Sequence, residues 1–152
     1  MIKKVTPFLM YNHSLDEVLD LYGSVFKDFK IINSSKGGDG KIQMATFQIH
    51  GQEIRAYNGG QYFKFTEGFS LMIDCETQAD VDYLWEKLSE GGKKSQCGWV
   101  EDKFGLSWQI IPTILMKMIG DKDREKANRA TQAMLKMGKI EIAELEKAFN
   151  KK

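Results

Sequence analysis

One feature limits the fold of this chain more than any other: a strand–helix–three-strand pattern occurs twice in its 152 residues. In the first copy, the segment 5–12 ("VTPFLMYN") is apolar on both faces, as expected for a buried strand. An amphipathic helix is expected at 14–29, because Leu, Val, Tyr and Phe side chains recur there at helical spacing. Three more strands, with glycine turns between them, are expected at 30–35, 41–49 and 52–58.

The second copy restarts with another buried strand, "FSLMIDCE", and its helix ends at a pair of glycines. Both helices are predicted to begin with a capping box, formed by Ser14 with Glu17 and by Thr77 with Asp80. The two cap residues are 63 positions apart. The strand, the helix and the three extended segments of this copy are expected at 69–76, 77–92, 93–96, 97–102 and 106–111.

A supersecondary unit that occurs twice predicts two βαβββ modules. Two such modules can place their sheets edge to edge, with helices on one side and a ligand cavity on the other. The predicted fold class is therefore α+β, with paired βαβββ modules that form an open U-shaped mixed sheet. We expect module one at 1–60, module two at 66–112 and a helical tail at 113–152, within the single domain 1–152. The alternative is a generic α+β sandwich whose halves are alike by chance.

The residues after Pro112 belong to neither module, and their apolar spacing predicts three helical segments at 113–120, 121–138 and 139–149. One face of these helices is rich in alanine and methionine, and this is more apolar surface than one small sheet needs as cover. These helices must pack this face either on the sheet or on a second subunit. Monomers rarely expose a large apolar patch, so we predict a two-fold homodimer. The residues of this stripe are Met116, Met118, Ala127, Ala130, Met134 and Met137.

Charge and cysteine content exclude several classes of protein. The formal net charge is +1, from 22 basic and 21 acidic side chains, which gives no electrostatic reason to expect nucleic acid or an anionic membrane as partner. No apolar run approaches the roughly 18 residues of a membrane span, and the N-terminus lacks the features of a signal peptide. Two cysteines are too few for a disulfide framework, so we expect a cytoplasmic protein.

The hairpin "CGWVEDKFGLSWQIIP" at 97–112 gives this chain its family resemblance, together with the opening "PFLMYN" and the tail "RATQAMLKMGKIEIAELEKAF". The chain resembles the PhnB-like branch of the glyoxalase/bleomycin-resistance/dioxygenase superfamily, also called vicinal oxygen chelate proteins. This branch is often described as a 3-demethylubiquinone 3-methyltransferase domain. The resemblance implies a ligand cavity formed by two modules, usually in a homodimer. In metal-dependent relatives, residues on the first and last strands of each module hold a divalent ion.

The residues at those metal-ligand positions are unsuitable for a divalent cation. Only Ser70 and Gln109 among them carry a side-chain oxygen, and neither is anionic, whereas such cations prefer carboxylates, thiolates or imidazoles. The two histidines, His13 and His50, are expected in solvent-facing turns. We therefore predict no metal and no cofactor. The positions that the resemblance assigns are Pro7, Leu9, Ile54, Ala56, Ser70 and Gln109.

Strand alternation combined with the family geometry predicts a largely apolar cavity wall with a few polar groups, suited to a small organic ligand. Gln109 is expected to point into this cavity and Trp108 into the core beneath a helix. Asp102 and Gly105 are expected to shape a tight turn. Met72 and Trp99 are equally compatible with packing against a partner subunit. The predicted lining residues are Leu9, Ile54, Ala56, Ser70, Met72, Asp74, Trp99 and Gln109.

Two functional hypotheses follow from this cavity. In the first, the chain binds a small molecule without a metal, as resistance proteins of the superfamily do. In the second, it is an enzyme: a metal-dependent lyase, isomerase or dioxygenase, a metal-free enzyme that uses Asp74 and Gln109, or the methyltransferase of its family description. The glycine segments "KGGDGK" and "YNGGQYF" match a phosphate-binding loop weakly, since a hairpin turn and an intermodule loop explain them.

Overall fold

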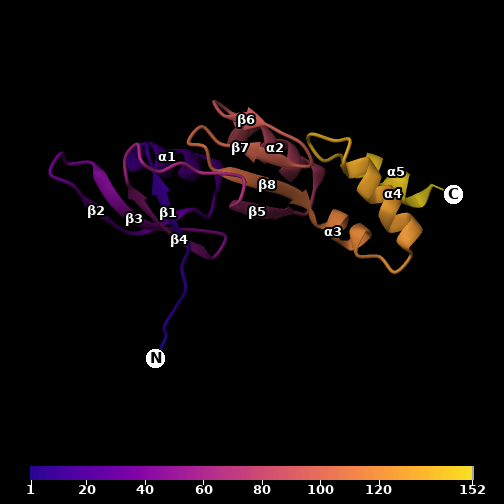
Figure 1. Cartoon of the computed structure of the whole chain (residues 1–152), viewed down its shortest axis with the longest axis horizontal. Helices are drawn as coiled ribbons and strands as arrows, with labels where there is room; N and C mark the ends of the chain where they lie inside the picture. The colour runs from indigo at the N-terminus through magenta and orange to yellow at the C-terminus, as the bar shows by residue number, and fades with distance from the viewer. Residues whose placement is uncertain (152) are drawn as a thin grey trace. The chain divides into compact units, whose positions relative to one another are not determined.

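The computed structural model describes residues 1–151 and divides the chain into two compact units, 1–64 and 65–152. Each unit contains a four-stranded mixed sheet and one helix that packs against it, and the second unit also contains the three tail helices (Figure 1). The predicted α+β class with two βαβββ modules is therefore confirmed. The division falls between the two predicted modules, and the tail belongs to the second unit.

The first unit follows the predicted order of elements. Strand β1 runs parallel to β4, and the other neighbouring strands are antiparallel, which gives the sheet order β1-β4-β3-β2. Each strand and helix lies at or inside its predicted segment, or extends one residue beyond it. The elements are β1 (Phe8–Tyr11), α1 (Leu15–Val25), β2 (Lys30–Lys36), β3 (Ile42–Ile49) and β4 (Gln52–Asn58).

Helix α1 covers one face of this sheet. The hydroxyls of Tyr11 on β1 and Tyr22 on α1 are hydrogen-bonded at 2.9 Å, and the Tyr22 and Phe47 rings lie 5.9 Å apart. All three side chains are fully buried. Because side chains alternate along a strand, every second residue of β1 and β3, counted from Tyr11 and Phe47, points toward α1.

The second unit repeats the same topology, with the sheet order β5-β8-β7-β6 and with β5 parallel to β8. Helix α2 packs on β7 and β8, and the buried side chains Val100, Trp108 and Ile110 of these strands face it, as predicted for Trp108. The elements are β5 (Ser70–Cys75), α2 (Gln78–Ser89), β6 (Lys93–Lys94), β7 (Trp99–Glu101), β8 (Ser107–Pro112), α3 (Thr113–Ile119), α4 (Arg124–Met134) and α5 (Ile142–Asn150).

The β7–β8 turn is built around the buried carboxylate of Asp102. Its oxygens accept hydrogen bonds from the backbone amides of Phe104 and Leu106 and from the indole nitrogen of Trp108. Gly105 has a φ of 89°, in the left-handed region that glycine adopts without steric cost. The predicted structural role of Asp102 and Gly105 is confirmed.

The tail helices pack on one another and on the end of β8. Their shared core contains Ile111 of β8 with Leu115, Met118, Ala130 and Leu145. Figure 1 shows α4 and α5 side by side, with α3 next to the end of β8. Most of the alanine and methionine stripe is thus covered inside the second unit: Ala127 and Ala130 are buried, Met134 and Met137 are partly buried, and Met116 is 50% exposed.

The two predicted capping boxes have different outcomes. At α2, the Thr77 hydroxyl accepts from the Asp80 amide and the Asp80 carboxylate accepts from the Thr77 amide, so this box is confirmed. At α1, the Ser14 side chain makes no capping hydrogen bond, so the predicted box with Glu17 is wrong. The first turn of α1 instead uses a carboxylate for a tertiary contact, in which Asp16 accepts from the amide of Ile42 on β3.

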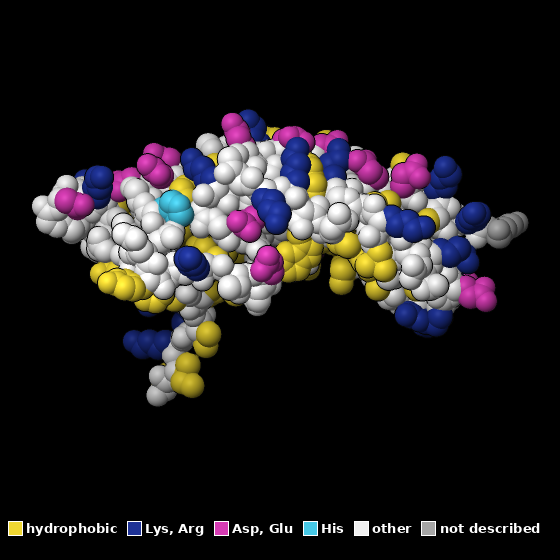
Figure 2. Space-filling view, turned by 45° about the horizontal axis from the view of Figure 1, so that its top comes forward, with side chains coloured by type: hydrophobic (Ala, Val, Ile, Leu, Met, Phe, Trp, Pro, Cys, Tyr) yellow, Lys and Arg dark blue, Asp and Glu magenta, His cyan; other side chains and the backbone are white. Residues whose placement is uncertain are grey.

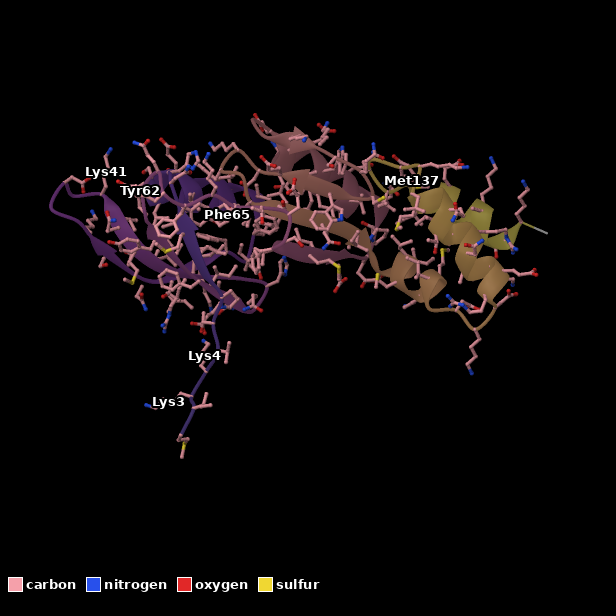
Figure 3. All side chains as sticks on the ribbon, viewed as in Figure 1. Lys3, Lys4, Lys41, Tyr62, Phe65 and Met137 are labelled. Carbon is pink, nitrogen blue, oxygen red and sulfur yellow. The ribbon has the colours of Figure 1, made fainter. Side chains whose placement is uncertain are left out.

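None of the helices within residues 1–151 is both long enough and apolar enough to cross a membrane. Hydrophobic side chains nevertheless reach the surface on the rim of the first unit and near α3 (Figure 2). The N-terminal segment before β1 is extended and carries Lys3 and Lys4 (Figure 3), and Lys4 forms an ion pair with Glu53 of β4.

Candidate ligand-binding face of the second sheet

The sheet of the second unit has one face toward α2 and an opposite face, which we call the open face. On the open face, strand register aligns Met72 of β5 with Gln109 of β8 and Trp99 of β7. The amide nitrogen of Gln109 donates a 2.9 Å hydrogen bond to the Ser70 hydroxyl on the neighbouring strand. A sulfur side chain, an amide and an indole therefore lie in one row across three strands.

A groove of about 330 Å³ lies along this part of the unit. Trp99 provides the largest aromatic surface among its lining residues, and Ser107 and Glu101 form the adjacent row of the open face. Lys93 on β6 is in register with Glu101, so the groove carries both a cation and carboxylates. The lining residues are Glu67, Lys93, Ser95, Gln96, Cys97, Trp99, Val100, Glu101 and Ser107.

This arrangement offers an aromatic surface and an amide that a small organic molecule could contact. Trp99 is half-buried, so its ring can stack on an apolar or aromatic group while part of it already packs in the unit. Within residues 1–151, the amide oxygen of Gln109 accepts no hydrogen bond, so it can accept one from a ligand. Burial on an aromatic wall and orientation by one amide are typical of ligand-binding sites.

The structure brings together the five predicted site residues of the second unit. Ser70, Met72, Asp74, Trp99 and Gln109 all belong to the open face, because the strand registers place them in alternation with Trp108 and Ile110. Met72 is 49% exposed and Asp74 is also exposed, and only Trp99 of the five lines the groove. Ligand binding by these residues stays a prediction.

The three predicted residues of the first unit lie on the other side of their sheet. Leu9 is in register with Ala56, and Ile54 is in register with Phe47, which contacts Tyr22 of α1. All three are therefore buried beneath α1, and their predicted orientation toward the cavity is wrong.

The physical reason for this error is the length of one connection. Three residues separate β1 from α1, but only two separate β5 from α2. When the two modules are aligned by their helix caps, β1 is therefore out of alignment with β5 by one residue. A one-residue shift moves each side chain of a strand to the opposite face. The face away from α1 carries Phe8, Met10, Arg55 and Tyr57 instead.

Most residues of the groove wall were not predicted from the sequence. Glu101 and Ser107 could have been found, because each is two residues from a predicted site residue on the same strand, Trp99 and Gln109 respectively. Lys93 and the 95–97 segment gave no such signal, because β6 has only two residues and its pairing with β7 depends on the tertiary fold.

The residues at the metal-ligand positions of the fold do not fit a divalent cation. On β8, the metal-ligand position is Gln109, on the open face. Its side chain is a neutral amide whose nitrogen already donates a hydrogen bond to the Ser70 hydroxyl. The corresponding face of β4 holds Arg55, a permanent cation. Across residues 1–151, no three His, Cys, Asp or Glu side chains are grouped so as to hold a metal. His50 lies exposed in the β3–β4 turn as predicted, whereas His13 is partly buried.

The Cys75 thiol and the glycine segment "KGGDGK" have structural explanations. Burial raises the pKa of the Cys75 thiol to about 12, with smaller contributions from Asp80 and Asp74, so this thiol is a poor nucleophile near neutral pH. The predicted hairpin turn in "KGGDGK" is confirmed, because the Gly37 amide donates to the carbonyl of Lys41 and the Gly40 amide to that of Gly37.

Comparison with known proteins gives one family and several similar structures. The family described as 3-demethylubiquinone-9 3-methyltransferase matches residues 3–111. No functionally curated protein matches the sequence. A putative 3-demethylubiquinone-9 3-methyltransferase, the PhnB protein from Bacillus cereus, is 29% identical with a TM-score of 0.67 and covers 73% of this chain and 100% of its own.

Two further structures are similar in fold. Protein PA1353 from Pseudomonas aeruginosa is 17% identical, with a TM-score of 0.61 over 73% of this chain and 98% of its own. The fosfomycin resistance protein FosX from Listeria monocytogenes, in complex with Mn(II) and sulfate, is 16% identical, with a TM-score of 0.55 over 72% of this chain and 92% of its own. The family match ends at residue 111, so the tail helices lie beyond it.

Proposed function

This chain belongs to the 3-demethylubiquinone-9 3-methyltransferase family, a PhnB-like branch of the vicinal oxygen chelate superfamily, and we propose that it binds a small organic molecule without a metal. The proposed site is the open face of the second sheet. The observation that carries the proposal is the row of Met72, Gln109 and Trp99 beside a groove of about 330 Å³. A volume of this size lies at the lower end of the range for small-molecule sites.

The mixed character of this surface indicates the kind of ligand. Trp99 and Met72 favour an apolar or aromatic body, and the amide of Gln109 favours a hydroxyl or amine donor on that body. The Ser70 hydroxyl holds the Gln109 amide in place, so less side-chain entropy is lost when a ligand binds. Apolar burial thus supplies most of the affinity, and the amide selects among ligands of similar shape.

The proposal has two further parts, a homodimer, which the superfamily resemblance supports, and a cytoplasmic location. We expect a homodimer, although the tail stripe that first suggested it is mostly covered within the second unit. In place of that stripe, the exposed side chains of Phe8 and Met44 on the first unit offer apolar surface to a partner. A cytoplasmic location is supported by the two free thiols, Cys75 and Cys97, because oxidising compartments favour disulfides.

A fragment-binding experiment tests the proposal. A set of fluorinated phenols and anilines is screened by ¹⁹F NMR line broadening against the protein, and each hit is then titrated against three variants. Gln109→Ala removes the orienting amide and should weaken binding by roughly threefold to tenfold, as expected for one neutral hydrogen bond. Trp99→Ala should weaken it by at least about tenfold, because the aromatic wall is lost.

Gln132→Ala is the matched control, since Gln132 is exposed on α4 and outside the groove. It should leave the affinity unchanged. Equal affinity of the wild type and Gln109→Ala for every hit would contradict the proposed site. Near-stoichiometric Ni, Zn, Fe or Mn in protein purified without chelator would contradict the metal-free part and favour a metal-dependent enzyme instead.

A further inference from the structure

The loop that connects β6 to β7 forms one wall of the groove and is bonded to the tail. Ser95, Gln96 and Cys97 of this loop all line the groove. The amide of Cys97 donates to the carbonyl of Met137, and the amide of Gly98 donates to the carbonyl of Gly138, each at 2.8 Å. Figure 3 shows Met137 between the tail helices and the sheet of this unit.

The loop has an unusual backbone that needs outside support. Cys97 and Gly98 are two consecutive residues in the left-handed region, with φ values of 57° and 81°. The left-handed conformation is unfavourable for cysteine and persists where surrounding contacts fix it. Gly98 has no room for a side chain, since a Cβ would lie 2.7 Å from the carbonyl oxygen of Ile110 and 3.2 Å from Ile140. The amides of both left-handed residues donate to the tail, while the Gly98 carbonyl accepts from the amide of Ile110 on β8.

The tail segment 137–142 is itself anchored to α2. The Gln78 side chain donates to the Ile140 carbonyl at 3.0 Å and accepts from the Ile142 amide at 2.8 Å. One side-chain amide thus pairs with both a backbone acceptor and a backbone donor of the segment. Lys139 forms an ion pair with Asp82 at 2.6 Å, and its hydrogen bond holds the pKa of Asp82 below the ordinary value. Ile140 is fully buried in the tail core.

We propose that the segment 137–142 is the positioning element of the groove: anchored by Gln78, it holds the Ser95–Cys97 wall in the shape that receives the ligand. This inference rests on the proposed function, and it adds that ligand selectivity is set partly by the tail. The family match ends at residue 111, so this control comes from a part of the chain outside the matched region.

The decisive substitution is Gly138→Ala, because it crowds the contact between tail and loop. A Cβ on Gly138 would lie 3.3 Å from the carbonyl oxygen of Ser95, so the loop and the tail must separate slightly. Gly120→Ala is the matched control: its Cβ would also lie 3.3 Å from a carbonyl oxygen, but that of Met116 within its own helix. The two variants differ in which neighbour is displaced.

Two measurements report on the wall directly. Hydrogen exchange of the Cys97 and Gly98 amides should be at least tenfold faster in Gly138→Ala than in the wild type or Gly120→Ala. The indole NH signal of Trp99 in a ¹⁵N–¹H spectrum should shift, while that of the buried Trp108 stays in place. Gln78→Ala, which touches neither the loop nor the groove, should produce the same two changes if the anchor acts through the segment.

The binding measurement separates this inference from the proposed function. With the ¹⁹F hits, Gly138→Ala and Gln78→Ala should lower affinity at least threefold and change the ranking of the fragments, and Gly120→Ala should do neither. Faster exchange with unchanged affinity and ranking would overturn the positioning role, while a loss of affinity in Gln109→Ala would still uphold the site. Unchanged exchange in both variants would also overturn it. If the wild type binds no fragment in the groove, the proposed function fails and the inference falls with it.

Discussion

The buried carboxylate of Asp102 allows a quantitative test of how the second module is held together. It is 1% exposed and accepts three hydrogen bonds of 2.9–3.1 Å, from the amides of Phe104 and Leu106 and from the indole of Trp108. Asp102→Ala leaves all three donors without this acceptor. Each unsatisfied buried donor costs about 1–3 kcal/mol, and water entering the turn recovers part of that cost. We expect Asp102→Ala to lower the free energy of unfolding by roughly 3–5 kcal/mol.

A double-mutant cycle separates the indole contribution from the backbone contribution. Trp108→Phe removes one donor and keeps most of the aromatic volume, so we expect a loss of about 1.5–3 kcal/mol, as for a hydrogen bond to a charged group. The indole bond is lost in each single variant but can be lost only once in the double variant. The stability losses of the two single variants should therefore sum to about 1.5–3 kcal/mol more than the loss of the double variant. Trp108→Ala should cost roughly 3–5 kcal/mol as a core truncation.

Urea unfolding monitored by circular dichroism measures these differences. Asp74→Ala is the matched control, because Asp74 is exposed on the open face of the same sheet and should change stability by less than about 0.5 kcal/mol. A loss below about 1 kcal/mol for Asp102→Ala would refute the reasoning, since the turn would then be stable without its acceptor. A loss that small for Trp108→Ala would mean that the faces of β8 are assigned the wrong way round.

Three further predictions concern other parts of the chain. The pKa of Cys75 is raised from 9.0 to about 12, so the thiolate forms more readily in the unfolded chain. The free energy of unfolding should therefore fall as the pH rises from about 9 to about 12. In alkaline denaturation curves, Cys75→Ala should remove this part of the fall. Gly92→Ala should cost at least about 2 kcal/mol in urea unfolding, because a Cβ would lie 2.1 Å from the carbonyl oxygen of Glu101, whereas Gly38→Ala, with nothing within 4 Å, should be nearly neutral. Sedimentation equilibrium at micromolar concentration should give about twice the chain mass of 17.4 kDa, and a single monomeric species would contradict the proposed dimer.

The order of the elements could be predicted from the sequence because local signals agree with the fold. Apolar alternation, glycine turns and the Thr77 cap each mark a boundary that the structure also has. The Ser14 box does not form, and the first turn of α1 has instead a tertiary contact that no local pattern encodes, the Asp16 carboxylate with the amide of Ile42. The apolar periodicity of the tail predicted its helices but not the surface on which they pack, because the contacts through Ile111 and Ile140 are long-range.

Those parts of the candidate site could be predicted for which strand alternation alone determines the face of the sheet that a residue occupies. On β8, the position of Gln109 opposite Trp108 follows from period two, and the structure agrees. The polar side of the groove depends on which strand lies beside which. Lys93 reaches its place through a two-residue strand, and Cys97 through bonds to a tail forty residues later in the chain. No local sequence pattern in β6 or in the loop between β6 and β7 encodes these contacts.

The extra residue between β1 and α1 gives the two modules different chemistry despite their shared topology. Once the strands are aligned through their pairings, Leu9 with Ala56 and Ile73 with Ile110, the counterpart of Gln109 is Arg55. A guanidinium repels a divalent cation and attracts a carboxylate or another oxygen-rich group. The first module therefore supplies a cationic donor where the second supplies a neutral amide. A ligand that contacts the face of the first sheet away from α1 should carry an anionic or oxygen-rich end, and Arg55→Gln should weaken the binding of such ligands selectively.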